Sequence, residues 1–461
     1  LRRSVVITGD DFSQVPCSSF STTATTCTMG LHTAMMARGG LLRMQHTRVE
    51  RCGQRGVLGK YCIHLHLIAP CPACVVRGNA VERSMQRGLI IHGTHQSLVE
   101  ANVFADVRGA NLYIEDGNEM YNRVLHNVAI CPWAREGAKR GCTVPGTDNG
   151  EADTALNQAG LWSLPSINHV VGNRFANHFN GMFFMANFAG GAGRGAAQGL
   201  LCTEAQLLGR IQGNTMHGHG RFGTYLLGPN FPRATDQSLE KNGRTDRATC
   251  GGFDAAGGDR GVSTLLDENV DYGNVFVGQY DAGDIQYRGH SAYDSNNLLY
   301  WKTTKNFADG CSAHLMGGEW AGGNVALPDQ AAFLIEGASV YGDTALEANH
   351  HCDVGVTGVL CMPTYVLVGV DWRSTAGRWM WFPAQGTGMK GGIFTLAPPE
   401  EANPSGAVFP PGYCALVSSS WDYLLAIGGG AACATAESLG VGGRYDGGIL
   451  CKRRLRSLRI Y

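Results

Sequence analysis

Three histidines and two carboxylates recur at a spacing that could bring them together. His64 and His66 form a His-x-His pair, His92 follows one repeat later, and Glu115 and Asp116 follow after a further repeat. Alternate residues of a strand share a face, and neighbouring strands lie about 4.8 Å apart, so these side chains would form a column. Imidazoles beside a carboxylate can transfer protons or bind a metal ion. These five residues are therefore the best candidates for a catalytic site.

A structural role competes with this interpretation, and we favour it. Stacked imidazoles can complete a polar ladder, and Glu115-Asp116-Gly117 is typical of a turn that bonds backbone amides. Cleavage of a glycan needs two carboxylates roughly 5–9.5 Å apart, whereas Glu115 and Asp116 would point to opposite faces if both lie on the strand. Asp116 and Glu119 could together bind calcium, but they offer too few oxygen ligands for a firm site. The sequence thus predicts no metal site.

Asparagines mark a repeat that would position these residues. Asn79, Asn102, Asn127 and Asn173 are separated by 23, 25 and 46 residues, and 46 is interpreted as two periods of 23. We expect the series to continue at Asn214, Asn274 and Asn297, of which the last two are 23 residues apart. A unit of about 23 residues with short strands and turn residues predicts an all-β, right-handed parallel β-helix. The competing β-sandwich would show strands every 8–12 residues or so.

The composition agrees with such a fold. The 461 residues include 65 glycines, and only 16% of the residues are charged. Abundant glycine, asparagine and β-branched residues favour tight turns between strands. The net charge of -1 provides no basic footprint for nucleic acid. No apolar run approaches the ~18 residues that cross a bilayer.

The cysteines indicate an oxidising compartment. The chain has 16 of them, which favours disulfides and an extracellular location. Cys71 and Cys74 form a C-x-x-C without a second pair at zinc-ribbon spacing. They are expected to pair within their loop or with partners such as Cys52 and Cys62. The polar segment from Cys131 to Thr154 is expected to be closed by a Cys131–Cys142 disulfide or by another pair. The full disulfide connectivity stays open.

The chain is predicted to divide into a long β-helix and a short C-terminal module. Residues 1–395 are predicted to form the β-helix, with loop excursions near 131–154 and 228–261. Residues 396–461 contain a Pro-rich boundary and a Cys-containing module that caps the helix. The first residues read as a strand without a signal peptide, which indicates a mature or partial piece of something longer.

Several motifs resemble one known family in the same order. The family pattern G-x-Y-x-[IV]-H-x-H matches Gly59–His66, [IV]-H-x-[TS] matches Ile91–Thr94, and G-x-x-[FY]-x-x-E-D-G matches Gly109–Gly117. This resembles the family of fibrocystin, fibrocystin-like proteins, the cell-migration-inducing hyaluronan-binding protein and the cell-surface hyaluronidase. The resemblance implies parallel β-helix repeats preceded by an eight-glycine domain. That domain is not recognisable here, and Cys62 stands where the family usually has proline.

The resemblance does not transfer a catalytic site. The carboxylates proposed for hyaluronan cleavage in some relatives lie nearer the eight-glycine domain. For glycan binding, Trp379 and Trp381 could form a stacking platform, with Arg108 as a weaker candidate, although we favour a role of the two tryptophans in capping the core. Gly218-His219-Gly220 is similar to a motif of pectin-degrading β-helices, but the clustered aspartates of those enzymes are missing.

These observations favour an extracellular structural protein. We expect a disulfide-braced β-helical scaffold that forms homo-oligomers or polymers, or joins other extracellular proteins or glycans, because open strand edges promote self-association. The first alternative is a carbohydrate-active enzyme resembling the hyaluronan-depolymerising relatives. The second alternative is a non-catalytic glycan-binding module.

Overall fold

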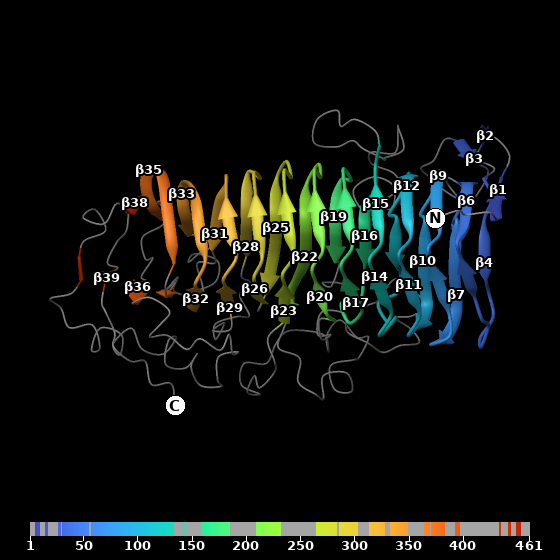
Figure 1. Ribbon diagram of the computed structural model, residues 1–461, viewed down its shortest axis with the longest axis horizontal. Coiled ribbons are helices and arrows are strands. Elements are labelled where there is room, and N and C mark those ends of the chain that lie inside the picture. Colours follow the sequence, from blue (N-terminus) through green and yellow to red (C-terminus); the bar gives the residue numbers. More distant parts are fainter. Residues whose placement is uncertain are drawn as a thin grey trace. The chain divides into compact units, whose positions relative to one another are not determined.

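The computed structural model is built from strands (Figure 1). Within the residues that it describes, every regular element is a strand. These residues are 5–9, 14–16, 26–28, 30–54, 57–132, 142, 158–184, 209–231, 264–283, 285–302, 313–327, 332–348, 364–368, 370–382, 392–396, 433–434, 441–443 and 449–452. The chain forms two compact units. Unit 1 contains residues 1–227, 239–250 and 271–276, and unit 2 contains 228–238, 251–270 and 277–461.

Unit 1 is a parallel β-helix whose coils have three sides. Strands on each side pair in parallel with their counterparts in the neighbouring coils. The first side comprises β5 (Arg43–Gln45), β8 (Val75–Arg77), β11 (Leu98–Glu100), β14 (Arg123–Leu125), β17 (His169–Val171) and β20 (Ile211–Gln212). The second side comprises β1 (Val5–Thr8), β6 (Thr47–Cys52), β9 (Ala80–Ser84), β12 (Val103–Val107), β15 (Val128–Ile130), β18 (Arg174–Ala176) and β21 (Thr215–His217).

The third side carries most of the candidate residues. It comprises β4 (Thr33–Met35), β7 (Ile63–Pro70), β10 (Leu89–His95), β13 (Leu112–Ile114), β16 (Ala159–Ser163), β19 (Asn180–Phe184) and β22 (Phe222–Phe231). A small antiparallel pair, β2 (Gln14–Pro16) and β3 (Thr26–Thr28), and β24 (Val270–Tyr272) complete the strands that contribute to this unit. Successive strands of the first three coils run side by side in the blue part of Figure 1.

Unit 2 has the same construction. One side comprises β23 (Thr264–Asp267), β26 (Ile285–Arg288), β29 (Ala313–Met316), β32 (Ala332–Glu336), β34 (Thr364–Val368), β36 (Gly392–Leu396) and β39 (Ile449–Lys452), with β37 (Cys433–Ala434) antiparallel to β39. The other sides comprise β25 (Val277–Gly283), β27 (Ser291–Tyr293), β28 (Asn297–Lys302), β30 (Glu319–Ala321), β31 (Asn324–Leu327), β33 (Ser339–Ala348), β35 (Asp371–Phe382) and β38 (Val441–Gly443). Its parallel ladders confirm a β-helix here as well.

A ladder of buried asparagines joins the coils of unit 1 at the corner between its first and second sides. The Nδ2 of each asparagine donates to the Oδ1 of the next at 2.9–3.0 Å, from Asn79 through Asn102, Asn127 and Asn173 to Asn214. From Asn102 onward, each Oδ1 also accepts the backbone N–H of the preceding asparagine. Amides that face a neighbouring strand can satisfy one another in this way, which explains their recurrence.

The ladder corrects two features of the predicted repeat. Asn127 and Asn173 bond each other directly, so their separation of 46 residues is one coil with an insertion and not two periods of 23. Asn274 lies elsewhere, because its Oδ1 accepts the backbone N–H of His219 at 3.1 Å. The residue before each ladder asparagine has a positive φ, as at Gly78 (66°) and Ala101 (54°). Glycine adopts this conformation without strain, which accounts for the repeated Gly-Asn pairs.

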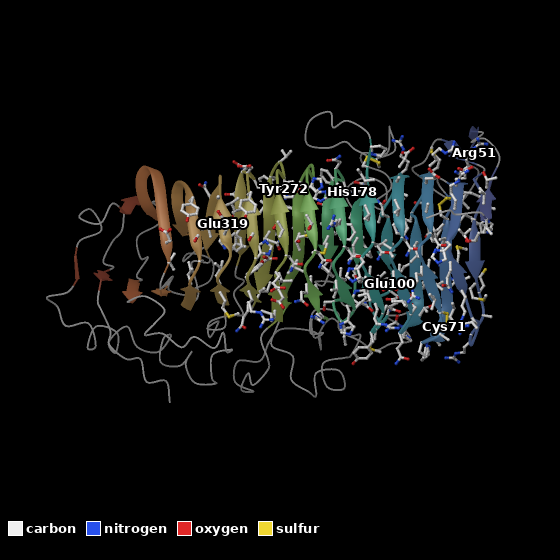
Figure 2. All side chains as sticks on the ribbon, in the orientation of Figure 1. Arg51, Cys71, Glu100, His178, Tyr272 and Glu319 are labelled. Atoms are coloured by element: carbon white, nitrogen blue, oxygen red, sulfur yellow. A yellow bond between two sulfur atoms is a disulfide. The ribbon has the colours of Figure 1, made fainter. Side chains whose placement is uncertain are left out.

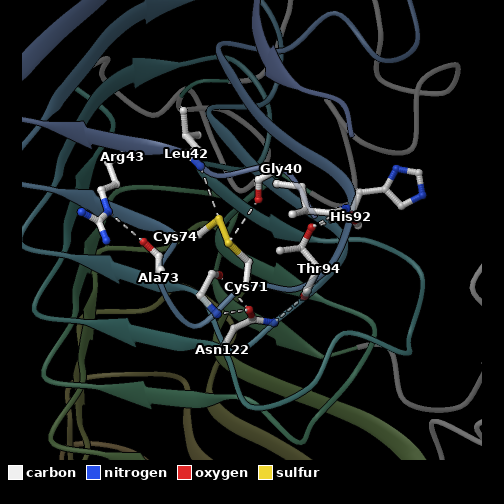
Figure 3. The surroundings of a disulfide bond; sticks show 11 residues. Gly40, Leu42, Arg43, Cys71, Ala73, Cys74, His92, Thr94 and Asn122 are labelled. Carbon is white, nitrogen blue, oxygen red and sulfur yellow. Dashed lines mark hydrogen bonds between the residues drawn. A yellow bond between two sulfur atoms is a disulfide. The ribbon is translucent and has the colours of Figure 1, made fainter. Parts of the chain in front are cut away.

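Among the described residues of unit 1, six cysteines form three disulfides. They join Cys52 to Cys62, Cys71 to Cys74, and Cys131 to Cys142. The structure thus pairs Cys71 with Cys74 within its loop, as in one of the two predicted alternatives. Figure 3 shows this disulfide between the backbone groups of Gly40 and Leu42. Most of the predicted excursions and of the 396–461 module lie outside the described residues, although residues 228–231, assigned to a loop, belong to β22.

Candidate functional site

The histidine cluster lies on the outer face of the third side. The alternating residues Leu65, Leu89, Ile91 and Leu112 are at most 1% exposed and line the interior of the coils. Neighbouring residues of a strand point to opposite faces, so His64, His66 and His92 project outward. The register pairs His66 of β7 with His92 of β10. The two strands therefore bring the imidazoles of adjacent coils together.

Three imidazoles converge through their ring nitrogens. His66 Nδ1 lies 3.3 Å from His64 Nε2 and 3.0 Å from His92 Nδ1. The rings of His64 and His92 are stacked with centroids 5.8 Å apart, and His66 lies edge-on to both. His64 is almost completely buried, and burial together with the neighbouring imidazoles lowers its pKa to about 3. His64 is therefore neutral over the ordinary pH range.

Two adjacent carboxylates contact the same imidazole. Asp116 Oδ2 lies 2.8 Å from His92 Nε2, and Glu115 Oε2 lies 3.5 Å from His92 Nδ1. Although burial opposes protonation, these two carboxylates raise the pKa of His92. The condition for Glu115 and Asp116 to point to opposite faces is not met, because β13 ends at Ile114 and neither residue lies on a strand. The chain turns there, and Gly117 has a φ of 93°.

Glu119 holds this turn in place. Its carboxylate is fully buried and accepts the backbone N–H groups of Gly93 at 2.9 Å, of Asp116 at 3.0 Å and of Gly117 at 2.9 Å. Burial and the negative charge of Asp116 raise the pKa of Glu119 to about 7, although the three backbone hydrogen bonds oppose this rise. Both Glu119 oxygens therefore face backbone donors, and this geometry does not support calcium binding by Asp116 and Glu119.

A buried arginine, which sequence reasoning missed, borders the cluster. Arg87 is 3% exposed, and its guanidinium lies 3.5 Å from the centre of the Tyr113 ring. Its Nη1 lies 3.5 Å from Glu115 Oε1 and donates to the Tyr61 hydroxyl at 3.2 Å. Guanidinium over an aromatic ring is a favourable pairing. Arg87 therefore holds Glu115 from the side opposite His92.

The same outer face carries a row of stacked aromatic rings. Tyr113 stacks on Trp162 with centroids 4.1 Å apart, and Phe183 stacks on Tyr225 at 4.6 Å. All four are 4–9% exposed and follow one another in the strand register. Each ring stands two residues after an equivalent position of its coil, occupied by Asn111, Gly160, Gly181 and Gly223, so aligning the strands by that position could have revealed the row.

The remaining glycan-binding candidates do not join this site. Arg108 forms an ion pair with Asp106 at 3.2 Å. Trp379 and Trp381 lie on β35, and their side chains lie outside the described residues. His95, which is close in sequence to His92, accepts the backbone N–H of Met120 through Nδ1 at 3.2 Å.

A second histidine pair is structural. His178 lies at the corner between β18 and β19 (Figure 2), is fully buried and stacks on His219 with centroids 5.7 Å apart. His178 Nε2 lies 3.0 Å from Asn111 Nδ2, and His219 Nδ1 accepts the backbone N–H of His178. These contacts give the Gly218-His219-Gly220 motif a packing role.

The His178 pair should make unit 1 sensitive to acid. Burial lowers the pKa of His178 to about 3 and that of His219 well below 6.5. Below pH 6.5 these two histidines bind protons in the unfolded chain but stay neutral in the folded chain. Each histidine should therefore reduce the free energy of unfolding by up to ~1.4 kcal/mol per pH unit below that value. Thermal unfolding of His178→Gln between pH 7 and pH 5 should show a shallower pH slope than the wild type. The exposed His126→Asn should keep the wild-type slope, and equal slopes for His178→Gln and wild type would contradict the assignment.

The comparisons with known proteins agree with this geometry. Residues 28–224 match the CEMIP beta-helix family. These residues are similar to the β-helix of that family. The match covers the asparagine ladder, the disulfides named above, the histidine cluster and the row of aromatic rings as far as Phe183. The resemblance to the fibrocystin and hyaluronidase family inferred from the motifs is thereby confirmed.

Relatives of the CEMIP β-helix domain are much longer proteins. Human Fibrocystin-L is 29% identical over 196 residues, which are 42% of this chain and 4% of Fibrocystin-L. Protein rliB of Dictyostelium discoideum is 30% identical over 162 residues, which are 34% of this chain and 14% of that protein. The human cell surface hyaluronidase CEMIP2 is 26% identical over 141 residues, which are 28% of this chain and 10% of CEMIP2. In the part of the chain described here, no helix has the length and apolarity to cross a membrane.

Proposed function

We propose that this chain is an extracellular structural segment, a disulfide-braced β-helical scaffold that self-associates or joins a larger assembly at the cell surface. The observation that carries this proposal is the buried ladder from Asn79 to Asn214, which fixes successive coils in one register. Because each coil buries its core only against its neighbours, such a stack is suited to building a rigid support. The three disulfides favour an oxidising compartment.

Exposed apolar side chains in the first coils offer a surface for assembly. Val6 is 42% exposed, Met36 68% and Leu58 73%. Val6 lies on β1 and Met36 follows β4, so the two belong to the same end of unit 1. Large exposed apolar groups that lie together are typical of contact surfaces between proteins. We therefore place the self-association surface at this end.

Light scattering on the native, unreduced protein, supported by negative-stain imaging, tests the scaffold. We expect discrete oligomers or regular polymers. The triple variant Val6→Lys, Met36→Lys, Leu58→Lys should dissociate them. The matched variant Val128→Lys, Ile130→Lys, which changes exposed apolar residues on β15, should assemble normally. A monodisperse monomer at high concentration would reject the scaffold proposal.

Glycan cleavage is the second candidate function. The observation that favours it is the contact of both Glu115 and Asp116 with His92, since a carboxylate–imidazole group can act as acid and base. CEMIP2, a relative, is named a cell surface hyaluronidase. Incubation with hyaluronan followed by size analysis of the polymer tests this function. Cleavage that is lost in Glu115→Gln and retained in the Val128→Thr control would support it, whereas an intact polymer would exclude it for this substrate.

A further inference from the structure

We propose that His64, His66 and His92 bind one divalent transition-metal ion of the zinc class, which clamps β7 to β10. The inference is independent of the scaffold proposal. One ligand nitrogen from each histidine lies within 4.8 Å of the other two. Imidazole nitrogens are among the preferred ligands of zinc, and three of them with an additional oxygen make a tetrahedral site.

The distances between the nitrogens fit such an ion. Zn–N bonds of 2.0–2.1 Å in a tetrahedron place ligand nitrogens about 3.3 Å apart. His66 Nδ1 lies 3.3 Å from His64 Nε2 and 3.0 Å from His92 Nδ1. Only small side-chain movements are therefore needed to surround an ion. Because the register already pairs His66 with His92, the backbone can stay in place.

Hydrogen-bond acceptors behind the rings of His64 and His92 determine which nitrogen of each ring is free to bind a metal. His64 Nδ1 lies 3.3 Å from the carbonyl oxygen of Gly59, so a proton on Nδ1 leaves a lone pair on Nε2 toward the cluster. His92 Nε2 lies 2.8 Å from Asp116 Oδ2, which favours a proton there and leaves Nδ1 for the metal. Carboxylates and carbonyls behind ligating histidines recur in zinc sites. Without a metal, one proton on His66 Nδ1 would have to be shared between His64 Nε2 and His92 Nδ1. A cation can accept the lone pairs of all three nitrogens.

Charge and access also suit a cation. Glu115 Oε2 lies 3.5 Å from His92 Nδ1, while Oε1 of the same residue lies 3.5 Å from Arg87 Nη1. Glu115 can thus supply the fourth ligand without giving up Arg87. The Glu115 side chain is 20% exposed, which provides a route from solvent. Nitrogen donors select zinc-class ions over calcium, which prefers oxygen.

Zinc titration of the chelator-treated, disulfide-intact chain tests this site. We expect one Zn²⁺ per chain and a rise in melting temperature on binding. Co²⁺ should give the visible absorption of a tetrahedral site without thiolate charge transfer. His66→Gln and His92→Gln should lower zinc affinity at least about 100-fold, and Asp116→Asn should lower it about 10- to 100-fold.

Matched controls separate ligation from folding. His46→Asn changes an exposed histidine of unit 1 whose φ of 53° asparagine tolerates, and it should bind zinc like the wild type. His66→Gln and His92→Gln should unfold at the temperature of the zinc-free wild type but should not respond to zinc. The proposal is overturned if the wild type binds no zinc, if either glutamine variant binds it unchanged, or if Ca²⁺ displaces it at equal concentration.

Discussion

Replacing Asn127 with alanine should lower the free energy of unfolding of unit 1 by about 4 kcal/mol. The fully buried side chain accepts the backbone N–H and the Nδ2 of Asn102 and donates to the Val99 carbonyl and to Asn173 Oδ1. Alanine removes all four hydrogen bonds and leaves a buried backbone N–H without its acceptor. Each such orphaned group costs roughly 1–3 kcal/mol.

Chemical denaturation measures the Asn127→Ala effect, and hydrogen exchange locates it. The amide of Asn102 should lose protection, because its acceptor is removed. Val128→Thr, at the adjacent and 37% exposed position, should change stability by less than ~0.5 kcal/mol. A loss below about 1 kcal/mol for Asn127→Ala would show that the ladder adds little beyond the strand pairing.

Replacing Glu119 with alanine should cost a similar amount and disturb the histidine cluster as well. The substitution removes the acceptor for the backbone N–H groups of Gly93, Asp116 and Gly117, at roughly 1–3 kcal/mol each. We expect a total loss of about 4 kcal/mol. Since Asp116 then loses its backbone anchor, zinc affinity should fall together with stability, which the unfolding and titration measurements detect.

The Glu119→Gln variant separates charge from hydrogen bonding. In the wild type, the pKa of Glu119 is raised to about 7. The folded chain therefore holds a proton that the unfolded chain releases above pH 4.5. This contribution is complete below pH 4.5 and is lost as the pH rises through about 7, the opposite direction from His178. Glu119→Gln should abolish this part of the pH dependence while losing less stability than alanine. An unchanged pH profile would show that Glu119 stays ionised throughout.

The sequence by itself determined the repeat and the members of the cluster. Asn79, Asn102 and Asn127 recur every 23 to 25 residues because each asparagine bonds its equivalent one coil away. The periodicity of the sequence therefore indicates a tertiary contact. The His-x-His pattern placed His64 and His66 on one face because side chains alternate along a strand. The motifs also led to the family whose β-helix residues 28–224 match.

Only the tertiary structure decided how these residues meet. An insertion changes the spacing along the chain but not the distance between coils, so the 46 residues from Asn127 to Asn173 could not be assigned to one coil by counting. Glu115 and Asp116 reach the same imidazole because β13 ends one residue earlier, and strand ends depend on packing rather than on residue type. The burial of Arg87 and Glu119 likewise depends on partners from other coils, which no local pattern contains.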